Sequence, residues 1–415
     1  MSHDVAFDLL VISRHAAPPA PAEVSRAFAS AGLGVADYTP ATTPATPSAE
    51  KVERIRVGAH VCTLPGGSGS ARIVTWQYMQ AVTDGMGDAT FATLTRAADA
   101  DTTSLLRTGT VSCNLRVTTH EDAVVEALGW AQAATGVLLE VTQGVVLDLG
   151  AQRCYGRAEA ARMASGDPLA HIAFHDEPWE VETRWLHTHG LQKFGRPEIE
   201  VVAAPVALVT EATALLRDVA LNLTAGERLA AGDEIELDDA GKMLAVSAQP
   251  DADHQAPFGR LRLVDAPLPG ERNGQRLARV LRGTALAEAR RRLDADDRAG
   301  ALEAIERVLT DDPDDASALA LKARIALRGG EAIEALELGE FMRLRAPEDY
   351  RGPLTMGVAL ATLGRYREAL HALDEAIEIE PEAADAFAER ADVHERLGHE
   401  QLASVDRAHA SYLAG

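Results

Sequence analysis

The feature that most constrains this chain is a 34-residue period in its last third. Three residue types recur at this interval: Pro313, Pro347 and Pro381; Gly330, Gly364 and Gly398; Ala301, Ala335, Ala369 and Ala403. A fixed period of this length is typical of stacked helical hairpins, which cannot bury their apolar sides singly. Such stacks are surfaces that hold another polypeptide, so the period indicates binding more than a reaction.

The repeating residues have separate physical roles. Small residues let neighbouring helices approach closely, glycine ends the first helix of each hairpin, where left-handed geometry is often required, and proline stops the second helix. This part resembles the tetratricopeptide-repeat (TPR) family. One repeat, 350–381, has the family's small, turn, aromatic, large and proline positions at Gly357, Gly364, Tyr366, Ala369, Leu373, Ala376 and Pro381. We therefore predict an all-α TPR solenoid of about three and a half repeats over 276–415.

The TPR resemblance implies a concave groove lined by the first helix of each hairpin, where a protein or peptide partner binds. By repeat position, the groove-facing residues are Arg290, Arg324, Arg328, Arg351, Asp385 and Asp392. Some TPR proteins grip a C-terminal carboxylate with Lys, Arg and Asn, but this part has no Asn after residue 274 and only Lys322, so we do not predict such a clamp. Two alternatives stay open: these arginines form a solvated face with ion pairs of ~0–1 kcal/mol each, or the stack docks on the N-terminal part.

The region 1–275 is predicted to be an α+β domain. Strands are expected at 5–13, 53–63, 109–118, 180–188, 198–204, 234–238, 243–248 and 259–264, with two β-rich runs in 137–148; helices are expected at 21–31, 120–135 and 207–223. Connections this short favour antiparallel pairing. We predict two ferredoxin-like halves, about 1–150 and 151–275, of mostly antiparallel β-α-β units. The turn-rich stretch GERNG at 270–274 marks the predicted boundary with the solenoid.

The densest group of polar residues lies within 171–200. It includes His171 and Glu200 at its ends and, as a candidate cluster, His175, Asp176, His187, His189 and Glu198. On a strand, His187 and His189 point to the same face, and two imidazoles with a carboxylate such as Asp176 or Glu198 could hold a divalent metal. The spacing fits no zinc motif such as HExxH. We therefore predict no cofactor, with structural histidines, and keep a metal at His187 and His189 as the alternative.

The same stretch carries a second resemblance. The segments WLHTHGL at 185–191, Phe194-Gly195 and PEIE at 197–200 are similar to a motif of bacterial proteins described as domains of unknown function. The segment QGVVLD at 143–148 resembles the strand that precedes this motif in those proteins. The resemblance implies no mechanism, and we expect a structural role for the motif first.

Composition narrows the partners and the compartment. The net charge of −23 is spread along the chain without a basic stripe, which argues against nucleic acid and against an anionic membrane surface. Three separated cysteines fit a reducing cytoplasm. We see no signal peptide at the N-terminus and no apolar stretch near the ~20 residues that a membrane helix needs.

The glycine-rich stretch 65–70 lacks a P-loop's Gly-Lys-Ser/Thr, and we expect a hairpin loop there.

These observations predict a cytoplasmic, bacterial interaction scaffold or accessory protein that pairs an α+β domain with a TPR module. We favour an interaction protein over an enzyme as its class. The alternative is a metal-dependent hydrolase that uses the His171–Glu200 cluster, with the repeats recruiting its substrate. The oligomeric state stays open.

Overall fold

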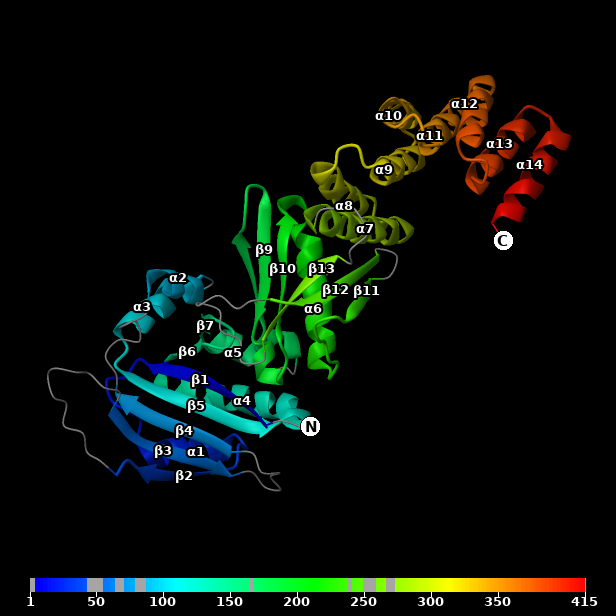
Figure 1. Ribbon diagram of the computed structural model, residues 1–415. Coiled ribbons are helices and arrows are strands. Elements are labelled where there is room, and N and C mark those ends of the chain that lie inside the picture. The colour runs from blue at the N-terminus through cyan, green and yellow to red at the C-terminus, as the bar shows by residue number, and fades with distance from the viewer. Residues whose placement is uncertain are drawn as a thin grey trace.

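A computed structural model describes residues 4–42, 55–63, 71–78, 87–96, 98–163, 167–237, 241–248, 259–265 and 273–414. The chain forms two β-sheets, each with its own helices, and then a curved arm of helices that ends at the C-terminus (Figure 1). An α+β part followed by an all-α part is therefore confirmed. The glycine-rich stretch 65–70 and most of the predicted boundary at 270–274 lie outside the described residues.

The first sheet is antiparallel throughout and has the strand order β2-β3-β4-β5-β1-β6-β7. Its strands are β1 (Asp4–Ser13), β2 (Val35–Pro40), β3 (Ile55–Thr63), β4 (Ala71–Tyr78), β5 (Val111–His120), β6 (Val145–Asp148) and β7 (Arg153–Tyr155). The helices of this part are α1 (Pro21–Ser30), α2 (Asp88–Thr95), α3 (Ala100–Thr108), α4 (Val124–Thr142) and α5 (Arg157–Met163).

Side-chain alternation along β1 decides how this sheet is covered. Val5, Phe7 and Leu9 belong to the core shared with α1 and α4, whereas Leu10 and Ile12 face a smaller cluster with α2 and α3. Successive strand residues point to opposite faces of the sheet. A strand with apolar side chains on both faces must therefore be covered on both sides. The continuous apolar run LLVI at 9–12 is the sequence counterpart of this double cover.

Helix α4 corrects two expectations. The segment 137–142, expected to be β-rich, continues the helix to Thr142, and only Val145–Asp148 forms a strand. The run VLLEV at 137–141 is apolar enough for either structure, and burial of Leu138 and Leu139 against the sheet selects the helix. At 19 residues, α4 is also long and apolar enough to cross a membrane, contrary to the expectation of no such stretch. It is mostly buried inside the fold, however, and buried core helices pass the same test.

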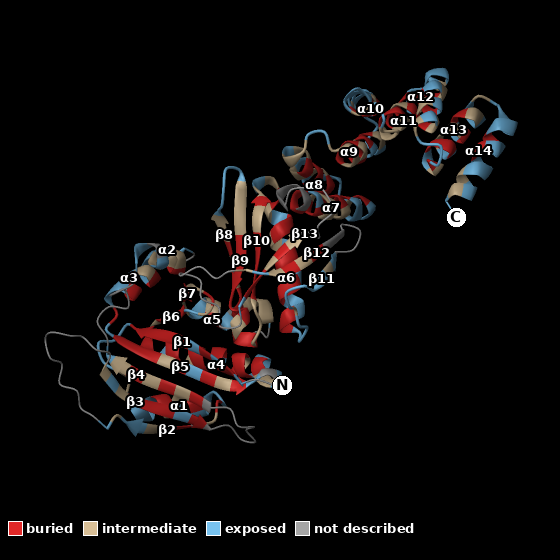
Figure 2. Ribbon diagram, viewed as in Figure 1, coloured by how far each residue is buried: buried red, intermediate tan, exposed pale blue. Residues whose placement is uncertain are grey.

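The second sheet has the strand order β11-β12-β13-β10-β9-β8, in which β10 and β13 alone among the described pairs are parallel. Its strands are β8 (Ala173–Pro178), β9 (Thr183–His189), β10 (Glu198–Pro205), β11 (Glu234–Leu237), β12 (Gly241–Ser247) and β13 (Arg260–Asp265). Ile199, Val201 and Leu261 join the apolar core with helix α6 (Val209–Thr224), which follows the short 3-10 turn η4 (Val206–Leu208). Buried residues gather between α6 and this sheet (Figure 2).

The prediction of two ferredoxin-like halves is wrong, although mostly antiparallel pairing is confirmed. The central strand β1 pairs antiparallel with both of its neighbours, β5 and β6, so the first sheet lacks the parallel central pair of a β-α-β unit. Over the described residues, the sheets also contain seven and six strands. Strands β2, β4, β7 and β8 were not expected. Strands β2, β7 and β8 are short and carry little signal. Strand β4 is eight residues long and alternates along Val74-Thr75-Trp76-Gln77, so its sequence does contain a strand signal.

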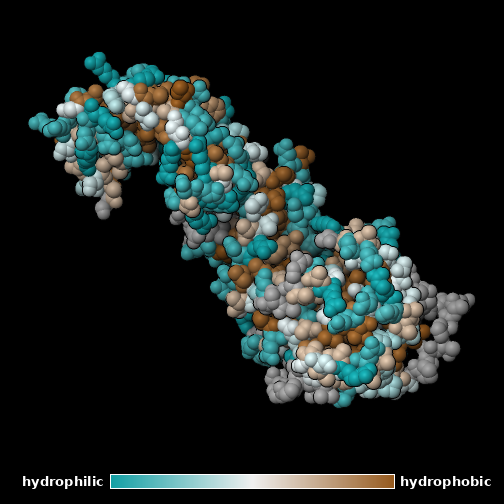
Figure 3. Space-filling model, turned by 180° about the vertical axis from the view of Figure 1, so that it is seen from behind, coloured by the Kyte–Doolittle hydropathy of each residue, from teal (hydrophilic) through white to brown (hydrophobic). Residues whose placement is uncertain are grey.

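The helical arm consists, within 273–414, of four hairpins. Their helices are α7 (Asn273–Asp294), α8 (Arg298–Asp311), α9 (Ala316–Arg328), α10 (Ala332–Arg345), α11 (Arg351–Thr362), α12 (Tyr366–Ile379), α13 (Ala384–Arg396) and α14 (Glu400–Leu413). The periodic alanines 301, 335, 369 and 403 are all buried, and the periodic prolines lie just after α8, α10 and α12. Seen from behind, the arm curves away from the sheets and its surface is mostly hydrophilic (Figure 3).

Helix α7 joins the two parts. Leu277, Val280 and Leu281 in its first half belong to the core of the α+β part, whereas Ala285 and Ala289 in its second half belong to the core of the arm. Arg307 of α8 adds an ion pair of 2.7 Å to the buried Glu211 of α6. The arm is therefore docked on the second sheet, and the boundary at 275 stays a prediction.

The turn inside each hairpin needs one residue with positive φ. Gly330, Gly364 and Gly398 have φ of 82°, 75° and 77°, and the equivalent residue of the first hairpin is Asp296, with φ of 61°. Asp tolerates this region at a cost that glycine avoids. The first hairpin therefore differs from the other three at this position, where Asp296 replaces the glycine.

We predict that Asp296→Gly raises the free energy of unfolding by up to about 1 kcal/mol, because it removes the penalty of a Cβ in left-handed backbone. Gly364→Ala, where an added Cβ meets no atom within 4 Å, should lower it by about 1 kcal/mol. Urea denaturation followed by circular dichroism measures both. A change of the same sign in the two variants would contradict this explanation.

Candidate functional site

A groove of about 460 Å³ runs across the first helices of the four hairpins. Its half-buried apolar floor consists of Leu327, Tyr350, Leu354 and Val358, with the buried Leu321 beneath. Helices α7, α9, α11 and α13 contribute its lining, because the curvature of the stack turns the first helix of each pair inward. The groove therefore presents both apolar and polar side chains along its length.

The charges of the groove differ along its length. Arg290 of α7 and Arg324 of α9 are exposed, and the nearest acidic oxygen to Arg324, in Asp294, is 4.0 Å away. At the α13 side lie Asp385 and Glu389. Burial, together with nearby Asp392 and Asp385, raises the pKa of Glu389. The groove is therefore basic toward α7 and acidic toward α13.

Arg351 lies between these two ends and is held in place. Its guanidinium makes a bidentate ion pair with Asp349 and donates to Ser317 Oγ at 2.5 Å. The hydrogen bond to Asp349 raises the pKa of Arg351 and fixes its planar group at the groove wall. A fixed guanidinium binds at lower entropic cost than a mobile one.

Two of the expected groove residues lie elsewhere. Arg328 donates to the backbone carbonyl of Leu293 at 3.4 Å, and Asp392 forms an ion pair of 3.1 Å with Arg407 of α14. Arg290, Arg324, Arg351 and Asp385 all line the groove, together with Ser317, Tyr350 and Glu389, which the repeat positions had not indicated. Sequence periodicity places a residue on a helix but gives its rotation only to within a few tens of degrees.

The candidate histidine cluster lies on the polar face of the second sheet. His175 of β8 is directly opposite His187 of β9, and His187 is opposite Glu200 of β10, which in turn is opposite Arg262 of β13. A polar row thus crosses four strands. Strand alternation explains it, because Ile199, Val201 and Leu261 take the other face, against α6.

Three of the five residues of the candidate cluster meet. The rings of His175 and His187 are 5.3 Å apart and nearly parallel, and the ring of His189 stands 5.0 Å from each at about 85°. Asp176 instead forms an ion pair of 2.6 Å with Arg184. Glu198 accepts hydrogen bonds from Thr188 Oγ1 and from the backbone of Gly190 and Gln192. Glu177, two residues from His175 and therefore on its face, is the carboxylate that joins the imidazoles.

The segment after the histidines connects the two sheets. Lys193, on the short 3-10 turn η3 (Leu191–Phe194), is fully buried and forms an ion pair with the equally buried Asp148 at the end of β6. Lys193 also donates to the backbone carbonyl of His171 at 3.3 Å. Burial lowers the pKa of Lys193, and the carboxylate of Asp148 opposes this shift. The two separate segments of the second resemblance, 143–148 and 185–200, are therefore joined by a buried ion pair.

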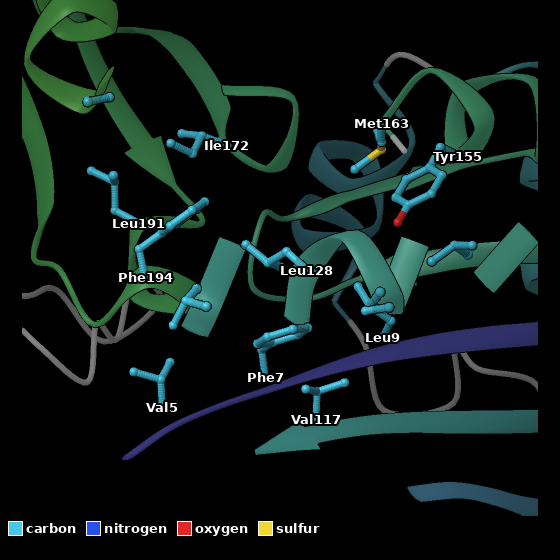
Figure 4. Close-up of a cluster of buried hydrophobic side chains, with 14 of the residues drawn as sticks. Val5, Phe7, Leu9, Val117, Leu128, Tyr155, Met163, Ile172, Leu191 and Phe194 are labelled. Atoms are coloured by element: carbon cyan, nitrogen blue, oxygen red, sulfur yellow. The ribbon is translucent and has the colours of Figure 1, made fainter. Parts of the chain in front are cut away.

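Apolar packing surrounds this ion pair. Leu191 and Phe194 lie between the two parts, toward Val5 of β1 and Leu128 of α4 (Figure 4). Gly190 allows the backbone of this segment to pack closely against His171. Its φ is 121°, and a Cβ there would lie 2.4 Å from the carbonyl oxygen of His171. The HTHGL segment thus contributes to the contact between the sheets, and the sequence alone did not specify this contact.

Comparisons with known proteins agree in part with the two resemblances. A family model described as "Protein of unknown function (DUF4026) C-terminal" matches residues 172–249. No curated protein matches the chain. The motif itself stays a prediction, because the match spans 172–249 and singles out no residues within that range.

Several solved structures are similar to about a third of this chain or less. A thermophilic TPR protein of Thermus thermophilus, TTC0263, is 26% identical and covers 32% of this chain and 74% of its own, with a TM-score of 0.30. MamA is 20% identical over 30% of this chain and 73% of its own, with a TM-score of 0.26. The second TPR of Spaghetti (RPAP3), bound to an HSP90 peptide, is 20% identical over 24% of this chain and 91% of its own, with a TM-score of 0.23.

We predict that Lys193→Met lowers the free energy of unfolding by about 3–5 kcal/mol, because it leaves the Asp148 carboxylate buried without its counter-charge. The double variant Asp148→Asn with Lys193→Met should recover part of this loss. Asparagine is neutral and keeps an acceptor for the backbone N–H of Ala151, which donates to Asp148 at 3.0 Å. Urea denaturation compares the variants; a double variant no more stable than Lys193→Met would contradict the prediction.

Stability should also depend on His171. Burial and the nearby charge of Lys193 lower its pKa from 6.5 to about 3. Between pH 6.5 and 3 the unfolded chain binds a proton at this site and the folded chain does not, so stability falls as pH falls, by up to about 1.4 kcal/mol per unit. We predict that His171→Phe flattens this dependence between pH 6.5 and 4.5 in urea denaturation. An unchanged slope would show that the loss comes from other groups.

Proposed function

We propose that this protein is an interaction scaffold whose arm binds an extended segment of a partner protein in the groove between α7 and α13. The observation that carries the proposal is the groove itself: first helices of four hairpins, an apolar floor, and opposite charges at its two ends. The TPR neighbours support a protein partner in general, and one of them is bound to a peptide.

Charge complementarity defines the partner segment. A peptide that is acidic where it meets Arg290 and Arg324, apolar over Tyr350 and Leu354, and basic where it meets Asp385 and Glu389 would match the groove along its length. Opposite charges brought together in a partly desolvated groove attract, and like charges repel, so the arrangement also selects the direction of the peptide.

The α+β part serves in this proposal as the body that carries the arm. The pairing of Arg307 with Glu211 and the shared helix α7 hold the groove at a set position relative to the second sheet. A cytoplasmic location remains a prediction from the sequence. The hydrolase alternative gains no support from the comparisons, since the matching domain is of unknown function.

We predict that the full chain binds a labelled peptide with acids at one end, apolar residues in the middle and lysines at the other. An isomer with the same residues but interleaved charges should bind about tenfold more weakly, a difference of about 1.4 kcal/mol. Fluorescence anisotropy at low salt measures both.

Charge reversal in the groove tests whether the peptide binds there. Arg324→Glu should weaken binding of the ordered peptide about tenfold. Arg345→Glu is the matched control, because Arg345 forms an exposed ion pair with Asp314 and does not line the groove. Equal binding of the two isomers, or equal losses in the two variants, would overturn the proposal.

A further inference from the structure

The register of β8 and β9 brings two metal-binding side chains together. His175 and His187 occupy directly opposite positions of this antiparallel pair. Opposite residues in such a pair have Cβ atoms about 4.5–5.5 Å apart, so their rings meet above one face of the sheet. The ring centroids are 5.3 Å apart, with 14° between their planes.

A carboxylate completes the group. Glu177 follows His175 by two residues, on the same face of β8, and is opposite Trp185 of β9. One donor atom from each of His175, Glu177 and His187 lies within 4.8 Å of the other two. Among the described residues, this is the group of three donor side chains that converges closely enough for one ion.

The surroundings restrain the imidazoles. The ring of Trp185 stacks on His187 at 4.0 Å, and the ring of His189 stands edge-on to both histidines. Side chains restrained by packing lose less entropy when they bind an ion. The three donors are therefore partly preorganised.

The local charges favour Glu177 as the anionic donor. Glu200, which is opposite His187 on β10, accepts from Trp185 Nε1 at 3.0 Å and forms an ion pair of 2.7 Å with Arg262. Glu177 has a weaker contact, 3.4 Å to the exposed Arg96. A divalent ion can replace this contact, and the Glu177 side chain is 26% exposed, so solvent reaches this donor.

We propose that His175, Glu177 and His187 bind one divalent transition-metal ion. Two imidazole nitrogens and one carboxylate oxygen form a donor set suited to zinc and to its first-row neighbours. Bonds of about 2.0–2.2 Å place tetrahedral ligands roughly 3.3 Å apart, so small side-chain rotations close the group. The ion ties β8 to β9 and leaves a coordination position for solvent. This site is independent of the groove and of its partner.

The test is a Zn²⁺ titration of full-length protein first treated with a chelator and dialysed. Isothermal calorimetry and elemental analysis should give one ion per chain. Glu177→Gln should weaken Zn²⁺ binding at least tenfold. Asp176→Asn is the matched control, because this neighbouring carboxylate pairs with Arg184 and is outside the donor group; its affinity should equal that of the unaltered chain.

His175→Gln provides a second loss-of-ligand variant, and circular dichroism checks that each variant is folded. Glu177 is half-buried and makes a surface ion pair, so its substitution keeps the test valid even if a histidine variant fails to fold. No stoichiometric Zn²⁺ in the unaltered protein, or equal affinities of the Glu177→Gln and Asp176→Asn variants, would overturn the proposal.

Discussion

The position of the arm on this protein depends on how helix α7 divides its apolar surface between two cores. Helical hairpins of this size do not bury enough apolar area alone, and a stack of them has two open ends. At one end, Leu277, Val280 and Leu281 place the first half of α7 in the core of the second sheet. The other half, through Ala285 and Ala289, begins the core of the arm. The hydrophobic effect therefore couples the arm to the body through one continuous helix.

The second joint, between the two sheets, relies on a different interaction. Lys193 and Asp148 are both buried, and burial of charges is unfavourable unless they are paired. Such a pair contributes less to net stability than to the choice of one arrangement over others, since any displacement leaves a charge in an apolar environment. Leu191 and Phe194 supply the apolar contact around it. The two joints together position the polar face of the second sheet and the groove of the arm.

The sequence predicted the arm well and the α+β part only coarsely. Repetition explains the difference. Ala335 and Ala369 are equivalent positions and both are buried, so each repeat gives independent support for the predicted helices of the others. No such redundancy exists in the sheets. The strand order of the first sheet depends on which strands pair with β1. The alternation of Val5, Phe7 and Leu9 predicts which face of β1 is buried, but not which helices cover that face. For the same reason 137–142 could be taken for strand, since a short apolar run suits either structure.

The sequence by itself determined the helical repeats, the turn positions at Gly330, Gly364 and Gly398, and the shared face of His187 and His189, because these follow from local periodicity. Only the tertiary structure decided that Glu177 rather than Asp176 or Glu198 joins the imidazoles, and that Lys193 meets Asp148. Both depend on register and on contacts between residues far apart in the chain. The free energy of such contacts depends on burial and on partners that no local pattern specifies.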